Sequence, residues 1–252
     1  MNQPAPVLVL SDKSRQVQTM FDAIAPRYDL LNRLLSARQD VRWRRALVRS
    51  LPTAVAADGV LFDVACGTGD VCLNVARDRR DYQRISGLDI SQGMIDVARS
   101  REPLNRIRTR RQLSGAFDLG FTLASAEELP LASNSGNALT IAFGLRNVDN
   151  RQRALCEFSR VLKPGGRVLI LEFFEAESSF FSKIFQVYFK FILPFIGGLF
   201  SSREAYEYLP QSVSTMPNAD EFKNMLEMAG FEHVTEQRWL GGATRLFTAD
   251  KK

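Results

Sequence analysis

The hydrophobic residues in the middle of the chain follow two periods in alternation. Short, continuous apolar runs predict buried strands at 60–65, 85–88, 121–123, 138–143 and 167–173. Between these runs, apolar residues spaced three or four positions apart predict helices, including one that begins near Asp70 and one over 150–162. Strands that alternate with helices in this way predict an α/β fold with a doubly wound, mostly parallel sheet.

The N-terminal part of the chain is expected to form a helical cap over 1–50. Residues 1–12 show no periodicity, so we interpret them as a frayed tail, and helical spacing follows. One predicted helix of the cap has a basic face, formed by Arg42, Arg44, Arg45 and Arg49. That face is either solvated or in contact with anionic lipid headgroups or nucleic acid.

The pattern changes after the fifth predicted strand. Residues 180–200 combine an apolar face rich in phenylalanine with Lys183, Gln186 and Lys190 on the opposite face, which predicts an amphipathic helix. These polar residues, together with Pro194, argue against a transmembrane span. The helix is expected to be a cap packed on the core, a lid over a lipid substrate, or an interfacial anchor.

The C-terminal part is expected to complete a seven-stranded sheet. It contains a predicted helix at 220–229 and two predicted strands near 233–239 and 243–249. The whole chain would then be one domain. Its expected parts are a helical cap at 1–50, a core at 58–173, a hydrophobic helical insertion or lid at 174–216, and a final helix with two strands at 217–252.

A glycine-rich turn follows the first predicted strand. Gly67 and Gly69 would turn the chain tightly into the next helix. Asp63 lies within the strand before the turn, and Asp89 ends the second strand, where an acid can bind ribose hydroxyl groups. The turn differs from that of a dinucleotide site, because Cys72 occupies the position of the third glycine.

Composition and charge narrow the function further. The chain has 252 residues, a net charge of +5 and a pI near 9.3, which permits an anionic membrane or nucleic-acid partner without requiring one. The three cysteines lack metal-ligand spacing and His233 is the single histidine, so we expect no metal and no histidine-dependent triad. A cytoplasmic protein with reduced cysteines is expected. The arginine-rich stretch 99–111 is expected to be a surface loop.

Several motifs resemble those of one protein family. The sequence DVACGTGD at 63–70 resembles motif I of the class I methyltransferases that use S-adenosylmethionine. Longer motifs resemble the C-methyltransferase family of ubiquinone and menaquinone biosynthesis, and most of all its demethylmenaquinone members. They are FDAIAPRYDLLN at 21–32, GLDIS at 87–91, AEELP at 126–130, IAFGLRNV at 141–148 and RVLKPGGR at 160–167. The resemblance extends from about Val17 to Gly242.

The resemblance implies a Rossmann-like class I methyltransferase fold, with the N-terminal cap and with a helical insertion after strand five. It also implies S-adenosylmethionine as cofactor. The residues that match the family's cofactor contacts are Asp63, Gly67, Thr68, Gly69, Asp89, Ser125 and Ala126. Many members have Asn in place of Ser125 and Ser in place of Ala142, so the contacts near the adenine are expected to differ here. Phe247 stands where many members carry a histidine, whose role therefore does not transfer.

The reaction implied is methyl transfer to a ring carbon of a polyprenylated naphthoquinol, from demethylmenaquinol to menaquinol. The candidate catalytic residues are Arg146, Asp29 and Tyr28, and the candidate substrate-binding residues are Asn32, Phe143 and Asn147. Because a guanidinium holds its proton at neutral pH, we interpret Arg146 as stabilising the developing quinolate. Asp29 or a water molecule would then accept the proton. In the alternative interpretation, Arg146 forms a structural ion pair that holds the N-terminal cap.

Other functions stay open at this point. A benzoquinol of ubiquinone biosynthesis or another prenylated phenol is an alternative acceptor, because ring recognition depends on pocket shape. A nucleic-acid methyltransferase is disfavoured, since FGLR at 143–146 replaces the motif expected after the fourth strand. The intact Asp63, Gly67 and Asp89 disfavour a non-enzymatic lipid-binding scaffold. We therefore expect a lipid quinol substrate, no nucleic-acid partner and a transient, peripheral contact with the inner membrane surface, and a homodimer stays open.

Overall fold

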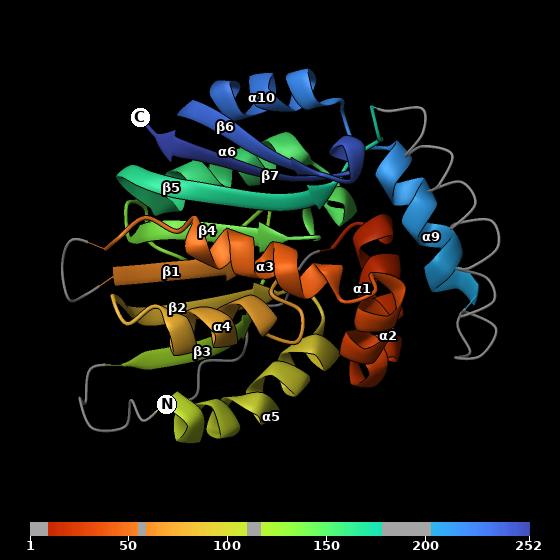
Figure 1. Cartoon of the computed structure of the whole chain (residues 1–252), viewed down its shortest axis with the longest axis horizontal. Coiled ribbons are helices and arrows are strands. Elements are labelled where there is room, and N and C mark those ends of the chain that lie inside the picture. The colour runs from red at the N-terminus through yellow and green to blue at the C-terminus, as the bar shows by residue number, and fades with distance from the viewer. Residues whose placement is uncertain (1–9, 55–58, 110–116, 178–202) are drawn as a thin grey trace.

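Seven strands form a single sheet through the centre of the molecule (Figure 1). The computed structural model describes residues 10–54, 59–109, 117–177 and 203–252. The strands are β1 Gly59–Val64, β2 Tyr82–Asp89, β3 Asp118–Leu123, β4 Gly136–Ala142, β5 Leu162–Phe173, β6 Phe231–Trp239 and β7 Thr244–Lys251. Their order across the sheet is β3-β2-β1-β4-β5-β7-β6. β1 to β5 are parallel and β7 is antiparallel to β5 and β6, which confirms the predicted mostly parallel seven-stranded sheet.

Helices cover both faces of this sheet, as predicted for a doubly wound fold. On one face lie α3 Gln39–Arg49, α4 Asp70–Asp78 and α5 Gln92–Thr109; on the other lie α6 Arg151–Val161 and α10 Ala219–Met228. Each face of the sheet has its own hydrophobic core. Successive residues of a strand belong to these two cores alternately, because side chains alternate between the faces of a strand. In β1, for example, Leu61 packs toward α4 while Phe62 packs toward α6. Figure 1 shows α3 and α4 in front of the sheet and α6 behind it.

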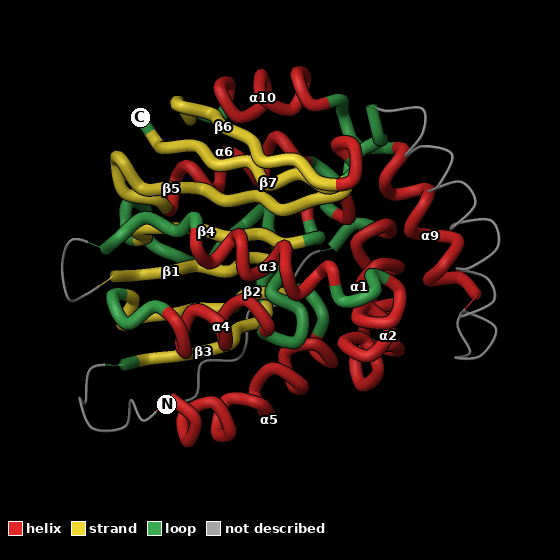
Figure 2. The backbone as a smooth tube through the Cα atoms, in the orientation of Figure 1, coloured by secondary structure: helices red, strands yellow, loops and turns green. Residues whose placement is uncertain are grey.

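Four further helices of the described residues lie beyond the carboxyl ends of the parallel strands (Figures 1 and 2). They are α1 Asp12–Ile24, the short helix η1 Ala25–Arg27, α2 Tyr28–Leu35 and α9 Arg203–Ser214. The carboxyl ends of parallel strands are where open α/β folds bind ligands. The N-terminal cap predicted from the sequence therefore covers the edge at which a site is expected.

The expected surface loop at 99–111 is wrong for residues 99–109, because α5 continues through Thr109; residues 110 and 111 lie outside the described residues. The helix is anchored on its buried side by Ile95 and Ala98. Arginine is also a good helix former, so a polar, arginine-rich sequence by itself does not end a helix. The expected amphipathic helix at 180–200 lies outside the described residues.

Two element boundaries also differ from the expected ones. α1 begins at Asp12, the last residue of the expected frayed tail at 1–12, because the Ser11 side chain accepts a hydrogen bond from the Ser14 backbone and caps the helix. β5 begins at Leu162, which pairs with Gly136 before the register shifts. The KPGG sequence at 163–166 thus lies within the strand rather than between helix and strand.

The basic face expected on α3 is divided between surface and core. Arg42, Arg45 and Arg49 are exposed, whereas Arg44 is buried beside Asp40. An Arg44 amino group lies 2.5 Å from Asp40 and 3.8 Å from Asp70. Arg44 therefore connects α3 to the start of α4 and is not part of a solvated face.

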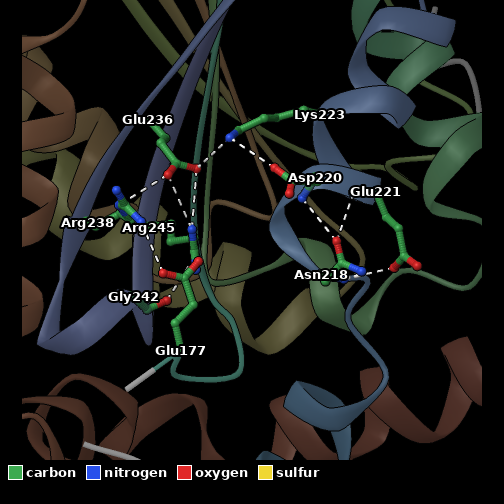
Figure 3. A network of polar contacts seen from close by, with 9 residues as sticks. All are labelled: Glu177, Asn218, Asp220, Glu221, Lys223, Glu236, Arg238, Gly242 and Arg245. Carbon is green, nitrogen blue, oxygen red and sulfur yellow. Dashed lines mark hydrogen bonds and ion pairs between the residues drawn. The ribbon is translucent and has the colours of Figure 1, made fainter. Parts of the chain in front are cut away.

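A second buried arginine holds the chain after β5 to the C-terminal strands. Arg245 in β7 is 2% exposed, and its guanidinium donates to the Gly242 carbonyl oxygen. It also forms ion pairs with Glu177, which follows β5, and with Glu236 of β6. Figure 3 shows these carboxylates on either side of Arg245, with Lys223 of α10 reaching Glu236. This network fixes the point from which the chain leaves the sheet toward α9.

The described residues contain neither a candidate membrane-spanning helix nor a candidate metal site. No helix among them is long and apolar enough to span a membrane. No group of His, Cys, Asp or Glu side chains among them is arranged to hold a metal ion.

Candidate active site

The turn between β1 and α4 uses its two glycines in different ways. Gly67 has a φ of +54°, and a Cβ added there would lie 3.8 Å from the Tyr28 ring, so this glycine leaves open space beside the turn. Gly69 has a φ of +81°, and a Cβ there would lie 3.0 Å from the Phe121 ring and 3.2 Å from Ala98. Gly69 thus permits close packing of α4 on the sheet, whereas Gly67 faces a cavity.

Asp89 at the end of β2 holds this turn in place. One carboxylate oxygen accepts a hydrogen bond from the Gly67 backbone N–H at 2.8 Å, and the other accepts one from the Ser91 N–H at 2.9 Å. Burial raises the pKa of Asp89, and the backbone hydrogen bonds partly offset this effect. The carboxylate can accept a further hydrogen bond from a ligand, and Asp89 lines the cavity that Gly67 faces.

A cavity beside the glycine turn lies between the ends of the parallel strands and the N-terminal cap, and we call it the main cavity. Its walls come from α1, α2 and the start of α5, from the segments after β1, β2 and β3, and from the end of β4 with the segment after it. The lining residues are Ser14, Val17, Phe21, Tyr28, Ala65, Gly67, Asp89, Ile90, Met94, Ala124, Ser125, Ala126, Glu127, Ala142, Phe143, Gly144, Asn147 and Val148. The cavity is mostly apolar, with a few polar groups at defined points, as is usual for small-molecule sites.

A smaller cavity on the other side of the turn contains a buried acid. It is lined by Asp63 together with Tyr28, Arg44, Thr68 and Asp70, among others. Asp63 accepts hydrogen bonds from the Thr140 hydroxyl at 2.6 Å and from the Cys72 thiol at 3.4 Å. Burial raises the pKa of Asp63 to about 7, and these two hydrogen bonds lower it only in part.

The raised pKa of Asp63 predicts a pH-dependent stability. Between about pH 4 and pH 7 the folded state keeps the Asp63 proton that the unfolded state has released. The stabilisation is therefore complete below about pH 4 and is lost as the pH rises to about 7. An asparagine has no such titration, so the Tm of the Asp63→Asn variant, relative to the wild type, should rise across this window. Thermal unfolding at several pH values measures the difference, and a Tm difference that is constant or falls with pH would contradict the prediction.

An ion-pair network fastens the cap to the glycine turn. Arg101 of α5 donates to Asp29 at 2.9 Å, to the Thr68 carbonyl at 2.8 Å and to Asp70 at 2.6 Å. The Thr68 hydroxyl donates to the other Asp29 oxygen at 2.6 Å. The two oxygens of Asp29 thus join α2 to the glycine turn and to α5, and Asp29 lines neither of the two cavities.

Arg146 forms a buried ion pair with a strand of the sheet. It lies in the short helix η3 Leu145–Asn147 and is 7% exposed. Its guanidinium lies 2.9 Å from Glu172 of β5, which is fully buried, and also donates to the Phe143 carbonyl. The second Glu172 oxygen accepts a hydrogen bond from the Arg146 backbone N–H at 3.1 Å. Arg146 is therefore paired with Glu172 of β5. The alternative interpretation assumed instead an ion pair that holds the N-terminal cap.

The structure brings most of the candidate residues to the two cavities. Tyr28, Gly67, Asp89, Ser125, Ala126, Phe143 and Asn147 line the main cavity, and Asp63 and Thr68 line the smaller one. Asp29, Asn32, Gly69 and Arg146 line neither. Phe143 lines the main cavity in a left-handed backbone conformation, with a φ of +61°, and its ring packs against Trp43 and Phe173.

Other residues of the site were not identified from the sequence. Val17 and Phe21 of α1 form a wall of the main cavity, and Glu172 holds Arg146. Phe21 begins the motif at 21–32, which was the one available signal. Glu172 gave no signal, because a single acid at the end of an apolar run does not indicate its partner.

Comparisons with known proteins found a family model, relatives and a solved structure that match most of the chain. The model of the ubiE/COQ5 methyltransferase family matches residues 9–251. A protein of Syntrophotalea carbinolica described as ubiquinone/menaquinone biosynthesis C-methyltransferase UbiE is 44% identical over 236 residues, which cover 93% of each chain. A protein of the same description from Geotalea daltonii is 40% identical over 96% of this chain and 99% of its own. The crystal structure of a SAM-dependent methyltransferase from Thermotoga maritima has a TM-score of 0.62 at 18% identity and covers 93% of this chain and 99% of its own, which shows a shared fold.

Proposed function

The chain belongs to the ubiE/COQ5 methyltransferase family, and we propose that it methylates a ring carbon of a polyprenylated quinol with S-adenosylmethionine as donor, converting demethylmenaquinol to menaquinol. One observation above all supports the proposal. The main cavity combines Gly67 and Asp89, which suit a nucleoside, with apolar walls from the cap, which suit a lipid-linked ring. A benzoquinol of ubiquinone biosynthesis is the second candidate acceptor, because the description of the relatives includes both pathways.

The residues at the cavity fit S-adenosylmethionine. The free lone pairs of Asp89 would accept hydrogen bonds from the ribose hydroxyls, and Ile90 and Ala126 would enclose the adenine. Asp63 and the glycine turn would hold the methionine end. When bound, the cofactor supplies an electrophilic methyl group on a positively charged sulfur.

The protein's own contribution is mainly orientation and charge stabilisation. Phe143 and Tyr28 would hold the quinol ring against the methyl group, since near-attack geometry can supply a large part of the acceleration. The quinol loses a hydroxyl proton, the ring carbon forms the new C–C bond while the C–S electron pair stays on sulfur, and the ring hydrogen then leaves as a proton. Arg146 would stabilise the quinolate charge. Because Asp29 already accepts hydrogen bonds from Thr68 and Arg101, we assign the proton acceptor to water at the cavity.

Methyl transfer from labelled S-adenosylmethionine tests the function. The purified protein is incubated with reduced demethylmenaquinone and, separately, with the reduced demethylated benzoquinol precursor and with total RNA. Label in menaquinone supports demethylmenaquinol as the acceptor. Label in the methylated benzoquinol alone would show that the second candidate is the acceptor. Label in neither quinol, with cofactor binding intact, would contradict the proposal.

We also propose that the protein contacts an anionic membrane surface to reach its substrate. Leu30 and Leu34 of α2 are 52% and 48% exposed, although both are large and apolar. They lie one helical turn apart and therefore share a face. Arg42 and Arg45 of α3 are exposed as well and carry positive charge. A surface with both exposed apolar side chains and positive charge is typical of interfacial binding.

Flotation with liposomes that contain anionic lipid measures this contact. Reversing the charge of Arg42 and Arg45 to glutamate should weaken binding at least about thirtyfold, since each arginine near such a surface contributes about 1 kcal/mol. The matched control reverses the charges of Arg80 and Arg84, which are exposed near the amino end of β2, whereas the cap lies beyond the carboxyl ends of the parallel strands. An equal loss of liposome binding in both double variants, or no loss in either, would argue against a localised contact with the membrane.

A further inference from the structure

Several buried polar atoms around η3 lack a hydrogen-bond partner among the described residues. Three of them are Nε of Arg146, Oδ1 of Asn147 and the hydroxyl oxygen of Tyr208. Buried polar groups in native proteins are nearly always paired, and leaving one unpaired is costly. Of the three residues, only Asn147 lines the main cavity, and Arg146 precedes it in η3. Unpaired atoms gathered beside one short helix next to this cavity indicate a ligand that supplies their partners.

Tyr208 reaches this place because α9 is fastened to η3. Arg151 at the start of α6 donates to the Arg146 carbonyl oxygen at 3.0 Å. The same guanidinium donates to the Thr215 carbonyl and to the Thr215 hydroxyl, both at 2.9 Å, directly after the end of α9. Figure 1 shows α9 at the same end of the sheet as the cap helices.

The surroundings keep the Tyr208 hydroxyl neutral. Burial raises the pKa of Tyr208, and the positive charges of Arg146 and Arg151 oppose this effect in part. The acids Asp149 and Glu172 also act on the hydroxyl and raise the pKa further. At neutral pH the group thus keeps its proton and can donate a hydrogen bond.

We propose that the Tyr208 hydroxyl donates a hydrogen bond to a ring oxygen of the bound quinol, beside Arg146, and so forms part of the substrate site. This inference rests on the proposed function and adds a residue to it. When the quinol hydroxyl gives its proton to water, negative charge develops on that oxygen. A neutral donor that is already in place stabilises the charged oxygen more than it stabilises the uncharged quinol. It therefore lowers the barrier to attack by the ring carbon.

Tyr208→Phe removes only the hydroxyl and tests the proposal. We expect kcat/KM for the quinol to fall about tenfold to a hundredfold, mostly through kcat, with the Kd for S-adenosylmethionine unchanged. Because the bound quinol would hold its proton more tightly, the rise of kcat with pH should shift to higher pH. The Tm should stay the same or increase, since the lost hydroxyl has no partner to leave unpaired.

Tyr82→Phe is the matched control. The Tyr82 hydroxyl donates to the Pro52 carbonyl at 2.8 Å, away from both cavities. Its removal should lower the Tm and leave kcat/KM unchanged.

The outcomes separate the inference from the function on which it rests. An active wild type, together with a Tyr208→Phe variant whose kcat and pH profile are unchanged, would overturn the inference alone. A Tyr208→Phe variant with reduced Tm and an unshifted pH profile would also overturn it, because the hydroxyl would then be structural. A wild type that methylates neither quinol would overturn the proposed function, and the inference with it.

Discussion

Replacing Arg146 with methionine is expected to lower the free energy of unfolding by about 3–5 kcal/mol. The reason is the fully buried Glu172, which would lose the guanidinium at 2.9 Å and remain as an unpaired charge in the core. Urea unfolding measures the change. A loss below about 1 kcal/mol would mean that the pair is open to water, contrary to its burial.

A double variant separates the structural role of Arg146 from its proposed catalytic role. Combining Arg146→Met with Glu172→Gln removes both charges and keeps one acceptor, for either the Arg146 or the Phe173 backbone N–H that Glu172 binds. Stability should recover by about half or more, because loss of both charges costs much less than loss of one. If Arg146 stabilises the quinolate, methyl transfer stays low in this variant. Recovery of activity along with stability would show that Arg146 serves only the fold.

Asp89→Asn is expected to weaken S-adenosylmethionine binding about tenfold to a hundredfold. Hydrogen bonds to a charged group contribute about 1.5–3 kcal/mol each, and the neutral amide would lose this strength toward ribose hydroxyls. The variant keeps one acceptor for the Gly67 or Ser91 N–H, so the turn should persist. Calorimetric titration of the purified protein gives the Kd.

Asp96→Asn supplies the control for this prediction. Asp96 lies on α5, is exposed, and accepts a hydrogen bond from Gln92. The same change of charge at this position should leave the Kd unaltered. Equal affinity of both variants and the wild type would remove Asp89 from the cofactor site.

The sequence was informative where the site is built from contiguous segments. Asp63, Gly67 and Asp89 belong to one strand–turn–helix–strand unit, and their relative positions follow from that order alone. The period of the apolar residues identified all seven strands, because burial on one or both faces of a sheet imposes a recognisable pattern. Charge composition was a poorer guide, since the arginines at 99–111 suggested a loop where α5 continues to Thr109.

The sequence by itself therefore determined the order of elements, the sheet, and the turn that faces the cofactor. Only the tertiary structure decided which charged groups are paired: Arg146 with Glu172, Arg101 with Asp29, and Arg245 with Glu177. It likewise decided that Tyr208 of α9 lies near η3. The physical reason is that periodicity records whether a position is buried, whereas the partner of a buried charge depends on which distant segments the fold brings together.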